Sequence, residues 1–359
     1  MADTMMVAMS GGVDSTVAAH LLRDRWKKMV GATHYIWPNS RCCSLEVQNR
    51  AEKACKALGI PYYIVNLEKE FRREVVNNFI NTYIEGRTPN PCIICNKKIR
   101  FDYFYNSMNK LLCAEGNMED DDVLYMATGH YVRLERKNGN LFLQKGTDPV
   151  KDQSYMLYRI PQTLLERLTF PLGNYLKSEV YRIAESLGIH EKSLKESQDV
   201  CFVNGDYGKF IEKETGSEGI FKHGLIKDIS GNVLGKHRGY IYYTIGQRRG
   251  LNLGSGPWYV SGIDAASNII FVARKEDAES RRFTVGDLSW FGRKPETRTH
   301  FTVKIRYQSS DIKCAFIPEE DNSAQIILEE PAFITPGQSA VFYSEDLVMG
   351  GGFILSVIR

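Results

Sequence analysis

The sequence lacks long apolar runs, internal repeats and a surplus of one charge. No stretch approaches the roughly 18 uncharged apolar residues of a membrane-spanning helix. The first residues lead directly into a strand-like segment rather than a cleavable signal. The chain has 46 basic and 43 acidic residues, and a net charge of +3 does not by itself indicate a nucleic-acid partner. We therefore expect a cytoplasmic protein that neither inserts into membranes nor forms fibres.

The cysteines also lack a regular pattern. Eight of them are spread irregularly over 359 residues, whereas disulfide frameworks belong to short secreted chains. We expect reduced thiols that serve catalysis or metal binding. The length exceeds the roughly 250–300 residues at which a single core stops growing, so the sequence predicts more than one domain.

The N-terminal half alternates strand-like and helical patterns. The apolar run Met5–Met9 ends at Ser10-Gly11-Gly12, and helical spacing follows from Val13 to Arg25. Similar signals predict strands at Val30–Trp37, Tyr62–Val65 and Leu124–Thr128, a hairpin turn at Asn138-Gly139-Asn140, and helices at Leu45–Leu58 and Lys177–Leu187. This alternation predicts an α/β fold with a doubly wound parallel sheet.

The pattern changes near residue 205. Beyond it, glycine-rich turns separate short β-branched and aromatic runs, and helical periodicity mostly disappears. We predict a mostly β second half with one boundary near residue 205 and a second within the charged segment Arg274–Arg282.

The segment Ser10–Ser15, Ser-Gly-Gly-Val-Asp-Ser, lies where the first strand meets the first helix. Its backbone N–H groups and hydroxyls face the same way as the positive end of the helix dipole, which favours an anion. The segment lacks the lysine of a Walker loop. A carboxylate beside phosphates would repel them, so Asp14 is best explained as a group that positions Mg²⁺.

Two thiols, Cys92 and Cys95, follow the stiff turn Pro89-Asn90-Pro91 and precede three cations, Lys97, Lys98 and Arg100. Nearby positive charge lowers the pKa of a thiol and so increases its reactivity. Half of a zinc site is the alternative, but no second Cys-x-x-Cys or His pair follows. A third candidate is Cys201, whose apolar, strand-like surroundings are also compatible with simple packing.

A basic segment lies in the second half. Residues 236–249 contain four Lys or Arg and no acid, interleaved with Tyr240, Tyr242 and Tyr243. Basic side chains neutralise phosphates and aromatic rings stack on exposed bases, so we expect Arg248 and Arg249 to contact RNA. A solvated edge of a β-sheet is the alternative.

Eight motifs in order resemble those of bacterial-type tRNA-specific 2-thiouridylases, members of the PP-loop pyrophosphatase superfamily. They are Ser10–Ser15, Gly86–Pro91, Cys95-Asn96, Ala127–Tyr131, Lys151–Tyr155, Ser197–Phe202, Gly246–Leu251 and Thr335–Ala340. Together they span nearly the whole chain. The resemblance implies a PP-loop ATP-binding catalytic domain at 1–205, a central tRNA-binding domain at 206–276 and a C-terminal β-barrel domain at 277–359.

The resemblance also implies roles for particular residues. The expected nucleotide contacts are Ala8, Met9, Ser10, Gly11, Gly12, Val13, Asp14, Ser15, His34 and Gly129, although relatives often have an apolar residue where His34 stands. The expected catalytic residues are Asp14, Cys201 as the persulfide carrier, and Cys95 as the thiol that closes the reaction. The expected tRNA contacts are Asn90, Pro91, Cys92, His130, Lys151, Asp152, Gln153, Arg306, Tyr307 and Gln338.

Cys92 departs from the resemblance, because many relatives have Asp-x-x-Cys where this chain has Cys-x-x-Cys. With Cys95 and Cys201 it makes three thiols, the ligand number of a [4Fe–4S] cluster with one open iron. We favour the persulfide–disulfide mechanism and keep the cluster as the alternative.

The implied activity is ATP-dependent 2-thiolation of the wobble uridine of tRNA, by adenylation of its C2 oxygen and sulfur transfer, with release of AMP and pyrophosphate. The expected partners are tRNA and a cysteine desulfurase or sulfur-relay protein, and the expected cofactors are ATP and Mg²⁺. Two rivals remain: another PP-loop ligase or amidase, which would need no cysteine pair, and a non-catalytic RNA-binding module.

Overall fold

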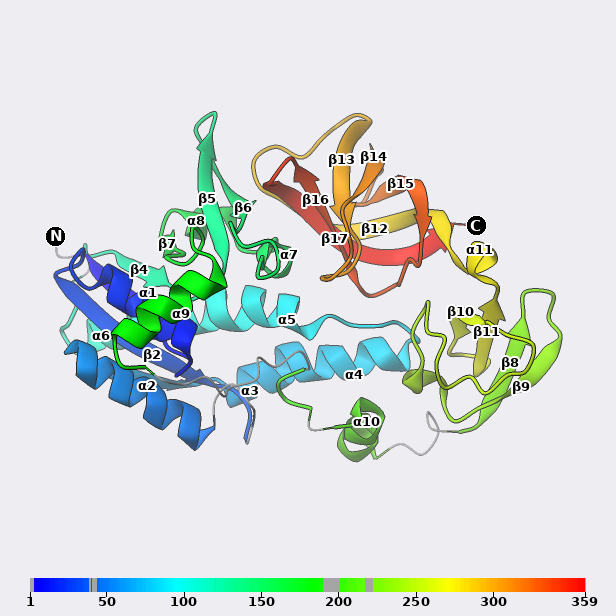
Figure 1. Cartoon of the computed structure of the whole chain (residues 1–359), viewed down its shortest axis with the longest axis horizontal. Helices are drawn as coiled ribbons and strands as arrows, with labels where there is room; N and C mark the ends of the chain where they lie inside the picture. The colour runs from blue at the N-terminus through cyan, green and yellow to red at the C-terminus, as the bar shows by residue number, and fades with distance from the viewer. Residues whose placement is uncertain are drawn as a thin grey trace.

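The computed structural model describes residues 3–38, 40, 44–119, 121–189, 200–203, 205–216 and 222–358. Figure 1 shows an N-terminal α/β region, a β-barrel formed by residues 280–358, and a small sheet beside the barrel. No helix among the described residues is long and apolar enough to cross a membrane.

A five-stranded parallel sheet organises the N-terminal region, in the order β3-β2-β1-β4-β7. The strands are β1 (Thr4–Ala8), β2 (Lys28–Tyr35), β3 (Tyr62–Asn66), β4 (Leu124–Ala127) and β7 (Leu168–Thr169). Met6 packs into one apolar cluster, whereas Met5 and Val7 pack into another, so both faces of β1 are buried. Burial on both faces explains the continuous apolar run and confirms the doubly wound prediction.

The helices predicted from periodicity are present as α1 (Val13–Leu22), α2 (Leu45–Leu58) and α9 (Lys177–Ser186). Helices α1 and α9 pack together, and Val17, Ala18, Val180 and Ala184 are buried in their shared cluster. Strands β2 and β3 lie on one side of β1, and β4 and β7 lie on the other. In sheets of this kind a ligand binds where the strand order changes direction, which here is at the carboxyl ends of β1 and β4.

Residues 68–114 form a helical layer that the sequence did not predict. Its members are α3 (Glu68–Phe71), η1 (Arg72–Val76), α4 (Asn77–Ile84), α5 (Pro91–Ile94), η2 (Cys95–Phe104) and α6 (Tyr105–Ala114), of which η1 and η2 are π-helical. Ile99 and Phe104 of η2 are fully buried in the large apolar cluster. π-Helical turns are rare and frequently occur at functional sites.

A hairpin links this region to the barrel. Strands β5 (Val132–Lys137) and β6 (Asn140–Lys145) are joined by Asn138 and Gly139, both with positive φ, as the turn signal predicted. Gln144 of β6 pairs with Leu347 of the barrel. Between the hairpin and α9 lie two short helices, α7 (Ser154–Leu157) and α8 (Gln162–Leu165).

The barrel is an antiparallel sheet of six strands that closes through pairing of its first and last strands. They are β12 (Ser280–Trp290), β13 (Thr299–Lys304), β14 (Ile312–Pro318), β15 (Ala324–Ala332), β16 (Ser339–Ser344) and β17 (Leu347–Ile358). Phe316 and Phe342 are fully buried in its core, and Trp290 stacks on Phe342 with ring centroids 5.7 Å apart. The predicted C-terminal barrel is confirmed.

The small sheet has the order β10-β11-β8-β9. Its strands are β8 (Gly224–Asp228), β9 (Val233–His237), β10 (Tyr259–Asp264) and β11 (Ile269–Ala273), accompanied by α10 (Tyr207–Thr215), η4 (Tyr240–Tyr242) and α11 (Lys275–Ala278). The second half is therefore mostly β, with α10 as an unpredicted helix.

The barrel also holds the loop that precedes α5. Thr88 N donates to Pro336 O at 2.9 Å, and Gln338 Nε2 donates to the carbonyl oxygens of Thr88 and Pro89, each at 3.0 Å. Gly337 has φ +91°, and a Cβ there would lie 2.7 Å from Thr88 O. The contact therefore requires glycine.

We expect Gly337→Ala to lower the free energy of unfolding by more than about 1 kcal/mol, because it adds a backbone clash to an unfavourable φ. Urea unfolding measures the change. Gly139→Ala is the matched control, since Gly139 has φ +79° and open space around its Cβ position. Equal losses in the two variants would mean that the clash with Thr88 contributes nothing.

Candidate functional site

The loop after β1 is built for close backbone packing. Gly11 has φ +65°, and a Cβ there would lie 2.5 Å from Val47 O of α2, so only glycine fits. Ser15 Oγ accepts from Ser10 N at 3.1 Å and donates to Gly12 O at 3.1 Å. These bonds fold the loop back over the first turn of α1.

The start of α1 offers backbone donors at this loop. Gly12 is the N-cap and has no side chain to accept from the first turn, and Val13 is the first helical residue. Gly129, just after β4, packs against the same turn, because a Cβ there would lie 3.0 Å from Ser15 N. Ala8 ends β1, and Met9 is buried with its carbonyl accepting from Thr33 Oγ1 at 2.6 Å. The structure thus brings the predicted nucleotide residues of β1, α1 and the end of β4 together at the carboxyl ends of these strands.

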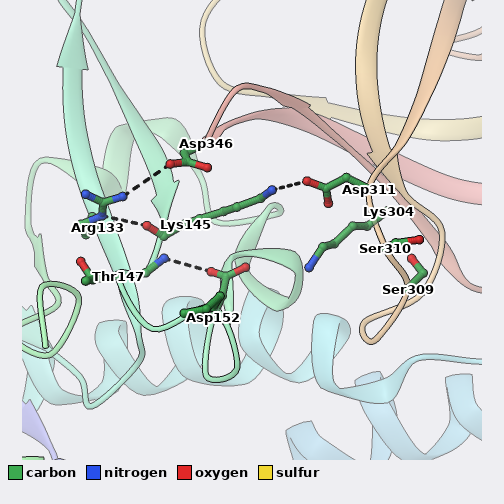
Figure 2. Close-up of a pocket in the computed structure, with 11 residues that line it drawn as sticks. Arg133, Lys145, Thr147, Asp152, Lys304, Ser309, Ser310, Asp311 and Asp346 are labelled. Carbon is green, nitrogen blue, oxygen red and sulfur yellow. Dashed lines mark hydrogen bonds and ion pairs between the residues drawn. The ribbon is translucent and has the colours of Figure 1, made fainter. Parts of the chain in front are cut away.

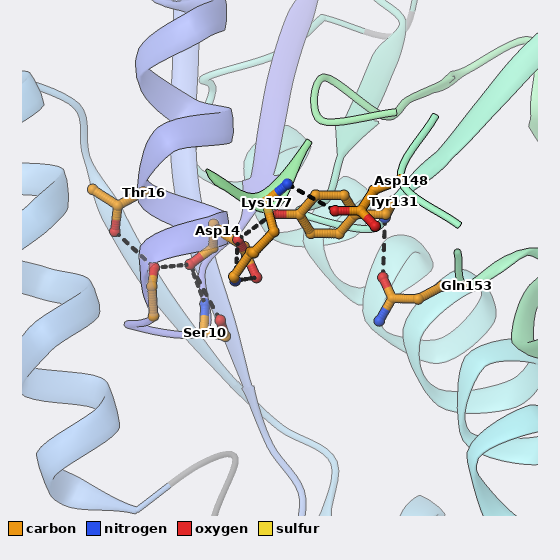
Figure 3. A network of polar contacts seen from close by, with 9 residues as sticks. Ser10, Asp14, Thr16, Tyr131, Asp148, Gln153 and Lys177 are labelled. Atoms are coloured by element: carbon orange, nitrogen blue, oxygen red, sulfur yellow. Dashed lines mark hydrogen bonds and ion pairs between the residues drawn. The ribbon is translucent and has the colours of Figure 1, made fainter. Parts of the chain in front are cut away.

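Asp14 is paired with a lysine that the sequence analysis missed (Figure 3). Lys177 Nζ lies 2.8 Å from Asp14 Oδ1 and 2.7 Å from Oδ2, and the hydroxyl of Tyr131 donates to Oδ1 at 2.7 Å. Lys177 N donates to Asp148 Oδ2 at 2.9 Å. The loop Ser10–Ser15 has no lysine of its own, unlike a Walker loop. The lysine beside it is Lys177, the first residue of α9. Lysine at a helix N-terminus opposes the helix dipole, which is the sequence signal that could have drawn attention to it.

A reciprocal pair of hydrogen bonds connects this site to a predicted RNA-binding turn. Tyr131 N donates to Gln153 Oε1 at 3.0 Å, and Gln153 N donates to Tyr131 O at 3.1 Å. Asp152 in the same turn is buried and accepts from Gly146 N, Ser154 N and Ser154 Oγ. The Asp152 carboxylate therefore shapes the turn Lys151–Gln153, whose contact with RNA stays a prediction.

His130 belongs to a polar network with Arg100 and Asn96 of η2. Arg100 Nη1 lies 2.9 Å from His130 Nε2 and donates to Asn96 Oδ1 at 2.8 Å. Guanidinium can only donate, so Nε2 accepts and Nδ1–H donates to Thr128 Oγ1 at 2.8 Å. Burial, and next the charge of Arg100, hold the pKa of His130 well below its usual value. The same two causes lower the pKa of His34 to about 3.

The neutral His34 makes stability depend on pH. The folded-state pKa of about 3 lies below the unfolded value of about 6.5, so the unfolded chain binds more protons between them and stability is lost as pH falls below about 6.5. We expect His34 to account for up to about 2 kcal/mol of this loss at about pH 5. Between about pH 6.5 and about pH 5, the free energy of unfolding measured in urea should fall less in His34→Gln than in the unaltered protein. His300→Gln, altered at an exposed position of β13, should keep the full loss.

The three candidate cysteines occupy distinct positions. Cys92 is exposed in α5, Cys95 is half-buried at the start of η2, and Cys201 is half-buried in a turn rather than the expected strand. All three are thiols, and Cys95 and Cys201 pack against the same large apolar cluster. The rest of the Cys201 motif, Ser197–Asp199, lies outside the described residues.

The expected activation of thiols by cations is wrong for Cys92. Desolvation by the surrounding protein raises the pKa of its thiol, and the charge of Arg100 offsets this only in part. Lys97 is itself desolvated, which lowers its pKa, and Arg159 and Asp287 are its strongest electrostatic neighbours. Lys97 is close to Cys92 and Cys95 in the sequence, but its strongest electrostatic interactions are with other residues.

Within the described part of the chain, which includes Cys92, Cys95 and Cys201, no three Cys, His, Asp or Glu side chains are grouped to hold a metal ion. The arrangement does not fit a [4Fe–4S] cluster, and the iron–sulfur alternative is not favoured.

The remaining predicted RNA contacts differ in exposure. Arg248 and Arg249 are exposed, whereas Arg306 donates from Nη2 to Ile245 O at 2.7 Å and also bonds to Thr335. Gln338 holds the carbonyls of Thr88 and Pro89. Arg306 and Gln338 thus join parts of the fold, which their motifs did not reveal.

The three further residues predicted to contact RNA are Asn90, Pro91 and Tyr307. Asn90 and Pro91 lead into α5, with Asn90 Nδ2 lying 3.8 Å from Met156 Sδ, and the ring of Tyr307 lies 6.1 Å from that of Tyr155. The rings of Tyr240 and Tyr243 are buried. The prediction that bases of RNA stack on these two rings is therefore wrong.

A parallel sheet whose first strand leads through a Ser-Gly-Gly-x-Asp-Ser loop into a helix, with a lysine facing that loop, defines a nucleotide-binding domain of the PP-loop class. Family models match along the chain: a tRNA methyl transferase HUP domain at residues 3–205, a tRNA methyl transferase PRC-barrel domain at 208–274, and an aminomethyltransferase beta-barrel domain at 280–354. A relative named tRNA-specific 2-thiouridylase MnmA, from Acetivibrio thermocellus, is 40% identical over 98% of this chain and 98% of its own. Another of the same name, from Clostridium botulinum, is 38% identical over 99% and 98%. The chain belongs to the tRNA-specific 2-thiouridylase family.

Proposed function

We propose that this protein uses ATP to replace the C2 oxygen of the wobble uridine of tRNA with sulfur. The observation that carries the proposal is the end-to-end identity of about 40% with relatives named for this activity, extending over all three matched domains. We assign catalysis to residues 1–205, tRNA binding to 206–276 and support of the catalytic loop to the barrel at 277–359.

The proposed nucleotide site lies at the carboxyl ends of β1 and β4. The N–H groups at the start of α1 and the hydroxyls of Ser10 and Ser15 would bind phosphate oxygens. Lys177 balances the charge of Asp14, so the carboxylate can lie beside phosphates without repelling them. Mg²⁺ carried with the nucleotide would add positive charge there and would share the Asp14 carboxylate with Lys177.

In the proposed sulfur step, adenylation first makes the C2 oxygen a leaving group. The terminal sulfur of a persulfide on Cys201 forms a bond to C2, and AMP departs. The thiolate of Cys95 then attacks Cys201 Sγ. The sulfur–sulfur bond breaks toward the sulfur on C2, which leaves 2-thiouridine and a Cys95–Cys201 disulfide. A thiol reductant restores both cysteines.

The remaining proposals concern partners. The exposed Arg248 and Arg249 would contact tRNA phosphates, together with the turn Lys151–Gln153. The persulfide on Cys201 would come from a cysteine desulfurase or a sulfur-relay protein. With these partners the proposed location of the reaction is the cytoplasm.

The test is mass spectrometry of nucleosides from wobble-uridine tRNA after incubation with the protein, ATP and a persulfide donor. We expect 2-thiouridine that depends on ATP, and one pyrophosphate released per thiouridine formed. Amidation of a base, or ATP cleavage without sulfur in the product, would instead indicate another PP-loop ligase. Binding without pyrophosphate release would indicate a non-catalytic RNA-binding module.

A further inference from the structure

Tyr131 and Lys177, the two side chains of the described part of the chain that hydrogen-bond to the Asp14 carboxylate, form one polar unit with it (Figure 3). The Lys177 ammonium lies on the carboxylate and also 5.7 Å from the centre of the Tyr131 ring, a cation–π distance. The positions of these two side chains therefore decide how Asp14 is held beside the loop Ser10–Ser15.

The main chain of both partners is fastened to the same turn, residues 148–153. At its start, Asp148 Oδ2 accepts from Lys177 N at 2.9 Å. At its end, Gln153 exchanges two hydrogen bonds with the main chain of Tyr131, at 3.0 and 3.1 Å. Asp148 and Tyr131 are buried, so breaking these bonds would leave buried polar groups unpaired. A displacement of the turn is therefore expected to move Lys177 and Tyr131 with it.

The turn is braced internally, whereas its tip is exposed. Asp148 Oδ1 accepts from Val150 N at 3.0 Å, and Asp152 accepts from Gly146 N (Figure 2) and Ser154 N, each at 3.1 Å. The side chain at the tip, Val150, is 82% exposed. A ligand on this tip would meet a stiff element whose base reaches the proposed nucleotide site.

The turn includes Lys151–Gln153, the segment proposed to contact tRNA. We propose that Gln153 and Tyr131 are positioning residues that couple tRNA binding to nucleotide binding; this inference rests on the proposed function. Binding of tRNA at the turn fixes Tyr131 and Lys177 on Asp14. Once the first ligand has ordered these groups, the second ligand does not bear the same entropic cost and binds more tightly.

The experiment measures binding of the α,β-methylene analogue of ATP with Mg²⁺ by calorimetry, with and without saturating wobble-uridine tRNA. This analogue cannot be cleaved at the bond that releases pyrophosphate. In the unaltered chain we expect tRNA to lower the Kd of the analogue by about 5- to 20-fold, and by linkage the analogue should lower the Kd of tRNA by the same factor.

Two variants interrupt the connection at different points. Gln153→Ala removes the acceptor of Tyr131 N, and Tyr131→Phe removes the hydrogen bond to Asp14. In both variants the coupling factor should fall below about 2-fold, whatever the affinity for each ligand alone. Gln153→Glu should keep most of the factor, because a carboxylate oxygen can also accept from Tyr131 N.

The matched control is Gln162→Ala. Gln162 of α8 makes the same kind of bond outside the turn, with Oε1 accepting from Gly292 N at 3.1 Å. Its substitution should leave the coupling factor unchanged.

An unchanged factor in Gln153→Ala and Tyr131→Phe would overturn the inference, because coupling through direct contact between nucleotide and RNA would survive both substitutions. An equal loss in Gln162→Ala, or no effect of tRNA on the analogue in the unaltered chain, would overturn it as well. Failure of the unaltered chain to bind tRNA or to form 2-thiouridine would instead count against the proposed function, so the two failures are distinguishable.

Discussion

Replacing Cys201 with serine is expected to reduce 2-thiouridine formation by more than about 1,000-fold while tRNA-dependent pyrophosphate release continues. A serine oxygen cannot carry the sulfur that must be transferred, whereas the nucleotide site at β1 and β4 does not involve this residue. Nucleoside mass spectrometry and a pyrophosphate assay, run on the same sample, separate the two steps. Thiouridine formed by the variant at the normal rate would remove Cys201 from the mechanism.

Cys95→Ser is expected to fail differently. Without the thiol that breaks the sulfur–sulfur bond, tRNA should stay attached to Cys201 through a disulfide, visible as a shifted band that a reductant removes. Cys92→Asp is the control: Cys92 is exposed in α5 and takes no step in the proposed sulfur transfer, so loss of its thiol should leave turnover largely intact. If Cys95→Ser formed no adduct, or Cys92→Asp were as inactive as Cys201→Ser, the assignment of the two working thiols would be wrong.

Lys177→Met is expected to reduce tRNA-dependent pyrophosphate release by about 100- to 1,000-fold, the usual cost of removing a charged group that stabilises a transition state. Its loss leaves the Asp14 carboxylate facing the proposed phosphate site with the Tyr131 hydroxyl as its remaining described partner. Asp14→Asn should also lose activity, because the variant lacks the carboxylate that would hold the Mg²⁺ carried with the nucleotide.

The matched control is Lys110→Met, which removes an exposed lysine from another helix of the N-terminal region, α6. Its activity should be normal. Circular dichroism of Lys177→Met should show that α9 remains folded. Full activity in Lys177→Met, or recovery of activity when Asp14→Asn is combined with it, would show that the pair only stabilises the packing of α1 on α9.

The sequence predicted the parallel sheet and the loop at Ser10–Ser15 because both follow from local pattern. A strand buried on both faces gives a continuous apolar run, as in Met5–Met9, and the glycines mark the turn that must follow it. The barrel was similarly marked by short strands and glycine-rich turns.

Lys177 could not be predicted in the same way, because it meets Asp14 across 163 residues of chain. The π-helical turns at Cys95–Phe104 are stabilised by packing of Ile99 and Phe104 in the apolar cluster, which residue preferences do not encode. Lys97 shows the same limit of sequence-based prediction. It is close to the thiols in the sequence, but Arg159 and Asp287 are its strongest electrostatic neighbours.

The contact between hairpin and barrel has a consequence for synthesis on the ribosome. Close to the hairpin, Ser154 Oγ of α7 lies 3.2 Å from the hydroxyl of Tyr343 in β16, its partner 189 residues later in the chain. At about 5–20 residues per second, roughly 10–40 s pass between synthesis of the two. During that time the edge of β6 and the loop at Thr88 have no barrel to hold them. A nascent chain that stalls before β16 would therefore expose an unpaired strand edge beside an unsupported catalytic loop, and chaperones that recognise such edges should bind it until the last two strands emerge.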